Sequence, residues 1–174
     1  MAHIKFAFSL LPPEVADTIV IYGCSAGGLA TLTWLETISE IALKANPKVK
    51  IMGLPDAGFF LDYPSNRTGN HDYGNRIKAL VNLVNKKQPL PNSKCVADNL
   101  ENPHFCLLAE HLINYITTPL FVSEYLYDFW QINNILDIEC VSYPRDDYPN
   151  LYNCNKDEMI EINKFRNRTA ELLA

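Results

Sequence analysis

The sequence predicts an α/β protein with a mainly parallel sheet flanked by helices. Three observations lead to this class: a β-branched run that ends at a glycine, a helical pattern directly after it, and a second strand-like run after the helix. Strand, helix and strand in this order form the unit from which parallel sheets with right-handed crossovers are built. Of the 174 residues, 48% are hydrophobic and 20% are charged, which is typical of a globular chain. We expect one domain over residues 1–174.

The first half of the chain supplies this unit. A strand is predicted over Thr18–Tyr22, because this β-branched and aromatic run leads directly into Gly23. A helix is predicted from Ala26 to Lys44, where apolar residues recur at spacings of three and four: Leu32, Leu35, Ile38 and Ala42. A second strand is predicted over residues 48–54, directly after the helix ends near Asn46-Pro47.

The second half is predicted to be mostly helical. The pattern indicates a helix over residues 72–84, a polar loop over 89–103 and another helix over 107–115. Residues 120–126, introduced by Pro119, read as a strand. The last element is a helix from about residue 157 to residue 173, capped by Asn155.

Charge and hydropathy exclude several classes of partner. The formal net charge is -5 and no run of five like charges occurs, so we expect no nucleic-acid or anionic-lipid partner. No apolar run approaches the roughly 20 residues that span a bilayer. The stretch Phe6–Leu11 is too short for a signal-peptide core and ends at Pro12-Pro13. We therefore expect no membrane span.

The cysteines indicate an oxidising compartment. Cys95 with Cys106, and Cys140 with Cys154, are short-range pairs that each enclose a loop rich in Pro, Asn and Asp. Disulfides at these pairs persist in secreted proteins. Two glycosylation patterns begin at Asn66 and at Asn167 and fit the same context, although such short patterns also arise by chance. We expect a secreted or extracellular protein.

The chemistry is expected at the segment Gly23-Cys24-Ser25-Ala26-Gly27, which matches the G-x-S-x-G nucleophile elbow between a strand and a helix. Small residues two before and two after the serine would let strand and helix approach, while a strained turn exposes the hydroxyl of Ser25. The backbone N–H of Ala26 would face a developing oxyanion. The alternative is a glycine-rich turn with an idle serine. For Cys24 we expect a buried free thiol that points away from Ser25.

Three blocks give the chain a resemblance to a known family. The segments Gly23 to Ala30, Asp56 to Asp62 and Tyr127 to Ile132 occur in this order, and the third begins Tyr-Asp-Phe-Trp-Gln. Together they resemble the pectin acetylesterase and Notum family, with the third block closer to the plant-type enzymes. The resemblance implies an α/β-hydrolase fold and ester hydrolysis through an acyl-enzyme, with Ser25 as nucleophile and Asp128 as the acid of the triad. For Asp128 the alternative is a solvated loop aspartate or a helix cap.

Other residues near these blocks are given structural roles. Asp56 also follows a strand, and we expect its carboxylate to bond nearby backbone N–H groups or to support the site from behind. Four aromatic residues are candidates for an acyl or sugar pocket, although aromatics at strand ends are more often core: Phe59, Phe60, Tyr63 and Trp130. The substrate-binding residues are otherwise unknown.

Two parts of the implied machinery have no match in the sequence. The family places its general base C-terminal to the aspartate, but the four histidines, His3, His71, His104 and His111, all precede Asp128. The family's Gly-Gly-Gly-Trp-type block, which supplies further oxyanion donors, is also absent. We expect either a piece of a longer esterase or a shortened homologue that has lost catalysis. Rescue of the triad by His71, His104 or His111 is the remaining alternative.

The function predicted from the sequence is that of a serine carboxylesterase-family chain that, when complete, removes O-acetyl groups from a polysaccharide such as pectin. Two alternatives stay open: a non-catalytic glycan-binding or scaffold remnant, and a Notum-like protein-lipid deacylase. No cofactor is expected, because the triad needs none. No metal site is expected either, because no histidine and cysteine cluster shows ligand spacing.

Overall fold

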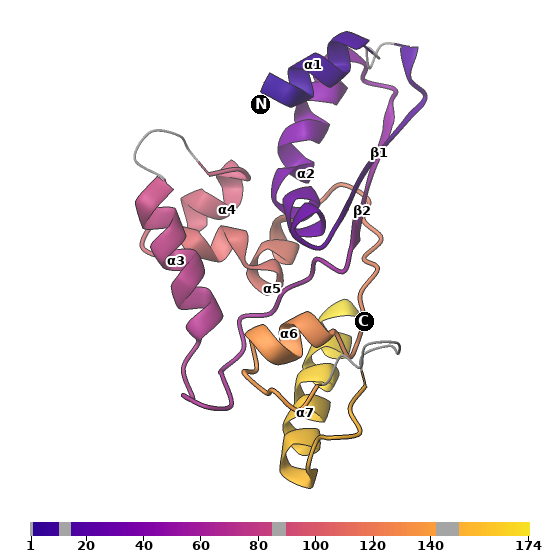
Figure 1. The fold of residues 1–174 in the computed structure, drawn as a ribbon. Coiled ribbons are helices and arrows are strands. Elements are labelled where there is room, and N and C mark those ends of the chain that lie inside the picture. Colours follow the sequence, from indigo (N-terminus) through magenta and orange to yellow (C-terminus); the bar gives the residue numbers. More distant parts are fainter. Residues whose placement is uncertain (1, 11–14, 85–89, 142–149) are drawn as a thin grey trace.

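The structure is a computed structural model that describes residues 2–10, 15–84, 90–141 and 150–174. A two-stranded sheet and its helices occupy one end of the molecule, and α6 and α7 lie at the other end (Figure 1). The elements in chain order are α1 (Ala2–Leu10), β1 (Thr18–Cys24), α2 (Ala26–Ala45), β2 (Lys50–Asp56), α3 (Asp72–Val84), α4 (Ser93–Asp98), the 3₁₀ helix η2 (Pro103–Leu107), α5 (Ala109–Leu112), the 3₁₀ helix η3 (Ile113–Tyr115), α6 (Phe129–Asn134) and α7 (Lys156–Leu173).

The predicted strand, helix and strand are confirmed. β1 and β2 are parallel, with Thr18 opposite Lys50 and Cys24 opposite Asp56, and α2 connects them. The predicted apolar stripe of α2 is buried at all four positions: Leu32, Leu35, Ile38 and Ala42. α1 had not been predicted. Its Phe8 packs against the cluster of buried residues at the far end of α2.

A third parallel row lies beside β2, where a strand was predicted over residues 120–126. Gly53 pairs with Leu120, and Asp56 pairs with Ser123. The N–H of Gly53 donates to the carbonyl of Pro119, and the N–H of Ser123 donates to the carbonyl of Pro55. Between these bonds the ladder would require a donor from Pro55, which has no N–H. The row is therefore a pair of isolated bridges and not a continuous strand.

Only one face of the sheet is covered by α2. Side chains alternate between the two faces of a strand, so Ile19, Ile21 and Ile51 face the helix. On the opposite face Val20, Tyr22 and Met52 are 50%, 61% and 42% exposed. Phe121 of the third row is 71% exposed. Parallel sheets are usually buried on both faces, so this bare apolar face is an unusual feature of the chain.

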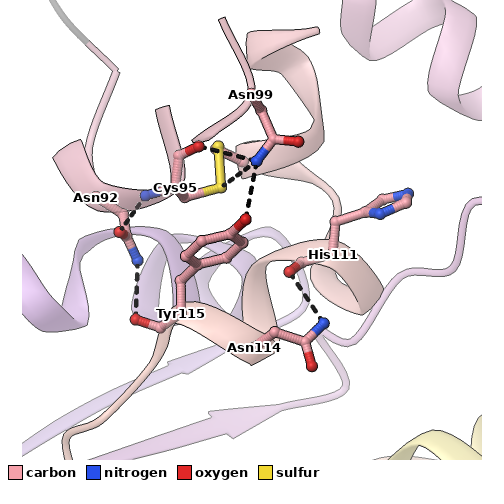
Figure 2. The surroundings of a disulfide bond; sticks show 7 residues. Asn92, Cys95, Asn99, His111, Asn114 and Tyr115 are labelled. Atoms are coloured by element: carbon pink, nitrogen blue, oxygen red, sulfur yellow. Dashed lines mark hydrogen bonds between the residues drawn. A yellow bond between two sulfur atoms is a disulfide. The ribbon is translucent and has the colours of Figure 1, made fainter. Parts of the chain in front are cut away.

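The segment predicted as a polar loop over 89–103 begins outside the described residues and contains α4. Asn92 adopts a left-handed conformation and its side chain accepts a hydrogen bond from the N–H of Cys95. Cys95 and Cys106 form a buried disulfide, and Asn99 donates to the carbonyl of Cys95 and to the Tyr115 hydroxyl beside it (Figure 2). The helix predicted over 107–115 is divided among η2, α5 and η3.

The C-terminal part packs against the same core. Cys140 and Cys154 form the second predicted disulfide. Asn155 caps α7, as predicted, and the Glu158 side chain completes a capping box. Ile162 and Phe165 bury their side chains in the main hydrophobic cluster. Among the helices that the structure describes, not one has both the length and the apolar character needed to cross a membrane.

Candidate active site

Ser25 lies in a sharp turn between β1 and α2. Its backbone has φ 56° and ψ -121°, a conformation that residues with a Cβ adopt only at a cost of about 1–3 kcal/mol. Its N–H donates to the carbonyl oxygen of Asp56 at 2.8 Å. Ser25 and its neighbours Cys24 and Ala26 are exposed to solvent. The turn thus holds an accessible hydroxyl in a strained conformation, as the motif predicts.

Glycines allow the strand and the helix to approach, but not at both of the predicted positions. A Cβ on Gly23 would lie 2.3 Å from the carbonyl oxygen of Gly27, so glycine is required at position 23, two residues before Ser25. A Cβ on Gly27 would meet nothing within 4 Å, so its predicted packing role is wrong. The close contact is made one residue later, where Gly28 and Gly58 face each other. A Cβ on Gly58 would lie 2.6 Å from the Cα of Gly28.

Ala26 is the first residue of α2. The first hydrogen bond of this helix runs from the N–H of Leu29 to the carbonyl of Ser25. The N–H of Ala26 therefore precedes the helical ladder, where N–H groups have no partner within the helix. Such a donor, next to the Ser25 hydroxyl, is available to an acceptor outside the helix.

Cys24 is exposed, so the prediction of a buried thiol is wrong. The reason is the alternation along β1, which places Cys24 on the same bare face as Val20 and Tyr22. Desolvation and the neighbouring Asp56 carboxylate raise the pKa of the Cys24 thiol. The thiol is therefore a poorer nucleophile at neutral pH than an ordinary exposed cysteine.

Asp128 begins α6 and caps it. Its Oδ1 accepts from the N–H groups of Trp130 at 2.7 Å and Gln131 at 3.2 Å. Its Oδ2 accepts from the Gln131 amide at 3.4 Å. The structure thus gives Asp128 the helix-cap role that the sequence left open. Three parallel rows lie side by side: Ser25 follows β1, Asp56 ends β2, and Asp128 follows the third row. The carboxyl edge of a parallel sheet is where α/β proteins bind ligands.

Within the described part of the chain, the Asp56 carboxylate is held by hydroxyl groups and not by the expected backbone N–H groups. Ser123 donates to Oδ1 at 2.9 Å, and Tyr22 lies 3.5 Å from Oδ2. Asp56 therefore ties β1 and the third row to β2 beside the elbow, a supporting role that fits the second expectation for this residue.

Glu124 was missed by the sequence analysis. Its carboxylate accepts hydrogen bonds from the N–H groups of Phe59 at 2.7 Å and Tyr125 at 3.1 Å. Burial raises the pKa of Glu124 to about 7, and the nearby Asp128 and Asp56 carboxylates add to the increase. No motif marks this residue. The available signal is its place directly after the third row, four residues before Asp128.

The candidate pocket aromatics mostly belong to the core. Phe59 and Phe60 are 0% and 6% exposed. Tyr63 packs edge-on against Phe165, with ring centroids 5.2 Å apart. Trp130 is 46% exposed although its ring lies 5.1 Å from that of Phe60. Of the four, Trp130 alone offers a large aromatic surface to solvent.

The histidines with described side chains have partners away from the elbow. His71 lies 3.2 Å from Asp62, and the His111 ring stacks on Phe105. His104 is buried beside Phe105, and burial lowers the pKa of its imidazole. Within the described part of the chain, none of these rings hydrogen-bonds to Ser25 or Asp128. The side chain of His3 lies outside the described residues.

The glycosylation patterns lie in different settings. Asn66 is exposed in a turn. Asn167 is exposed on α7, but the threonine of its pattern, Thr169, is 1% exposed and donates to the carbonyl of Phe165.

Comparison with known proteins identifies relatives in sequence. Residues 13–174 match the family Pectinacetylesterase. Pectin acetylesterase 5 of Arabidopsis thaliana is 34% identical over 121 residues, which is 70% of this chain and 27% of that protein. Pectin acetylesterase 7 of the same plant is 28% identical over 163 residues, which is 91% of this chain and 40% of that protein. The chain thus spans less than half the length of these relatives.

The fold also has a solved counterpart. The structure of the Wnt deacylase Notum from Drosophila superposes with a TM-score of 0.77 at 19% sequence identity. The superposition covers 98% of this chain and 45% of that chain. It confirms the predicted α/β fold class and the incomplete α/β-hydrolase-like arrangement. Because the family match extends over nearly the whole sequence, this chain belongs to the pectinacetylesterase family.

Proposed function

We propose that the chain carries the nucleophilic part of a serine esterase, with Ser25 as the nucleophile. The Ser25 hydroxyl oxygen would attack the carbonyl carbon of an ester, and the N–H of Ala26 would donate to the resulting oxyanion. Collapse of this intermediate breaks the bond to the alcohol, which leaves with a proton, and water then releases the acid from the acyl-serine. Asp128 is assigned the acid position, where it would orient a histidine.

The observation that carries the proposal is the backbone of Ser25. A serine at φ 56° is strained, and the strain exposes a hydroxyl at the carboxyl edge of a parallel sheet. An idle turn would be expected to use glycine or asparagine at this position. The Asp128 cap is compatible with the proposal, because it occupies Oδ1, while among the described residues Oδ2 has only the 3.4 Å contact with the Gln131 amide.

The proposed substrate is an O-acetylated polysaccharide such as pectin, outside the cell. Support comes from the family, from the relatives named pectin acetylesterases and from the two disulfides, which are typical of secreted proteins. The exposed Trp130 ring at the start of α6 offers a flat apolar surface of the kind that sugars contact.

The test is acetyl transfer to Ser25. The chain and its Ser25→Ala variant are incubated with 4-nitrophenyl acetate and acetylated pectin, and intact mass and peptide mapping locate any acetyl group. We expect acetylation at Ser25 in the parent chain only. Turnover that disappears in the variant would show that a base lies within these residues. Equal acetylation of both proteins would contradict the proposal.

A second candidate function is non-catalytic glycan binding. It is favoured by the contacts of three described histidines, which lie against Asp62 or Phe105 and not against Asp128: His71, His104 and His111. Under this alternative, the chain would bind acetylated pectin without releasing acetate, and Ser25→Ala would bind equally well. Calorimetric titration of both proteins against the same polysaccharide separates the two functions. A Notum-like protein-lipid deacylase would instead accept a fatty acyl ester in the first assay.

A further inference from the structure

We propose that Asp62, Glu110 and His111 form a binding site for one divalent transition-metal ion. Their ligand atoms all lie within 4.8 Å of one another, and the Nε2 of His111 is 3.9 Å from the Oε1 of Glu110. The three residues come from the segment after β2 and from α5. Only the fold brings them together, since Asp62 and Glu110 are 48 residues apart in the sequence.

Asp62 is the ligand with the strongest structural evidence. Its Oδ1 is buried and receives no hydrogen bond, although His71 Nδ1 lies 3.2 Å away. The carboxylate is packed against Gly74 of α3, where a Cβ would lie 2.4 Å from Oδ1. A buried carboxylate oxygen that receives no hydrogen bond lowers the stability of the fold. A bound cation would satisfy this oxygen.

His111 is held in place and remains accessible. Its ring stacks on that of Phe105, with centroids 4.3 Å apart and planes 16° apart. The ring points away from the Cys95–Cys106 disulfide (Figure 2). Because the side chain is 39% exposed, water can complete the coordination of an ion at Nε2. The disulfide ends in η2, directly before α5, so it fixes the backbone that carries both Glu110 and His111.

The charges around the site suit a dication. Two carboxylates contribute negative charge, and Arg168 lies 3.5 Å from the Oε2 of Glu110. That arginine contacts the oxygen other than the one nearest His111, so it orients Glu110 without occupying the proposed position. One imidazole and two carboxylates, with water, are ligands for zinc, cobalt, nickel or manganese. His71 would act as the orienting neighbour of Asp62.

The other cluster of possible ligands in the described residues does not compete. It consists of Cys140, Cys154 and Glu158, but the two cysteines are joined in a disulfide. A cysteine binds a metal ion as a thiolate, and the two sulfurs cannot take this form while the disulfide persists.

The test is zinc binding measured by calorimetry and cobalt binding measured by visible absorption, at pH 7.5 and at pH 5.5. All proteins carry Cys24→Ser, which removes the exposed thiol as a competing ligand. We expect one zinc ion per chain, a raised melting temperature with zinc, and weaker binding at the lower pH, because protons compete for the ligands. Activity is not needed as a readout, so this test is independent of the proposed esterase function.

The variants distinguish the residues proposed to bind the metal ion directly from residues that only lie near the site. Asp62→Asn and His111→Gln remove proposed ligands and should each weaken zinc binding by about 100-fold or more. His71→Ala should weaken it by about 10-fold, because residues that orient a metal ligand typically contribute about 10–100-fold. Glu101→Gln, at an exposed acidic residue outside the cluster, is the matched control and should bind as the parent does. Circular dichroism checks that each variant is folded. If Asp62→Asn does not fold, His111→Gln decides. No binding by the parent, or equal binding by a folded His111→Gln, would overturn the proposal.

Discussion

The backbone N–H of Ser25 donates to the carbonyl oxygen of Asp56 at 2.8 Å, across the carboxyl ends of β1 and β2. This bond joins the strained turn to β2. The side chain of Asp56 is in turn held by Ser123 and Tyr22. The positive φ of Ser25 is therefore fixed by the sheet and does not depend on the serine side chain.

Ser25→Gly should stabilise the fold. Glycine adopts φ 56° without the strain of about 1–3 kcal/mol, while its greater freedom in the unfolded chain costs about 0.5–1 kcal/mol. We expect a net gain of about 1 kcal/mol in the free energy of unfolding in urea. Ser25→Ala removes the same hydroxyl but keeps the Cβ, so its stability should stay near that of the parent. Equal stability of the two variants would show that the turn is not strained.

Gly28→Ala and Gly27→Ala should have opposite effects. A Cβ on Gly28 would lie 2.7 Å from the carbonyl oxygen of Asp56, a backbone atom that is held in the sheet, so we expect a loss of about 1–3 kcal/mol. Gly27 has open space and lies in the same helix, where alanine is favoured by up to about 1 kcal/mol. Thermal unfolding of both variants measures the contrast. A neutral Gly28→Ala would refute the tight contact between α2 and β2.

Glu124→Gln should change how stability depends on pH. The pKa of Glu124 is raised from 4.5 to about 7, so between these values the folded state binds more protons than the unfolded state. Stability from this group is therefore greatest at low pH and falls as the pH rises from about 4.5 to 7. We expect a fall of about 2 kcal/mol, after allowance for partial exposure, in the parent but not in the variant.

Urea unfolding from pH 4.5 to pH 8 provides the measurement for Glu124. The quantity compared is the difference in unfolding free energy between variant and parent, in which contributions from other groups cancel. Glu171→Gln, at an exposed glutamate on α7, is the control and should leave the pH profile unchanged. A profile for Glu124→Gln parallel to that of the parent would mean that the buried carboxyl has an ordinary pKa.

Asn66 should be glycosylated in preference to Asn167. Its pattern lies in an exposed turn, whereas the pattern at Asn167 is helical and buries the hydroxyl of Thr169 against the Phe165 carbonyl. The measurement is glycopeptide mass spectrometry after secretion from a eukaryotic host. Asn66→Gln should then leave the chain without N-glycan. A glycan at Asn167 in that variant would contradict this expectation.

Elements with a local pattern could be predicted from the sequence. The stripe from Leu32 to Ala42 defines α2, and Asn155 with Glu158 defines the start of α7. The strained turn at Ser25 also follows from a local motif and its flanks. Both disulfides join cysteines only 11 and 14 residues apart, so their pairing could be inferred from spacing.

Features that depend on distant contacts could not be predicted. The need for glycine at position 28 comes from Gly58 and Asp56, and the exposure of Cys24 comes from a sheet face that α2 does not cover. The interruption beside Pro55 depends on which segment pairs with β2. α4 was missed because its cap, Asn92, lies in a polar stretch that reads as a loop.

The bare face of the sheet includes Val20, Tyr22, Met52 and Phe121, and we expect it to promote self-association in concentrated solution. Apolar side chains that stay in contact with water attract any similar surface, and the outer edge of β1 lies beside them. The same side chains should bind fluorescent hydrophobic dyes in the native state, a response normally associated with partly unfolded proteins. Dye fluorescence is therefore a poor measure of unfolding for this chain, and replacing Phe121 by a charged residue should both dim the dye and improve solubility.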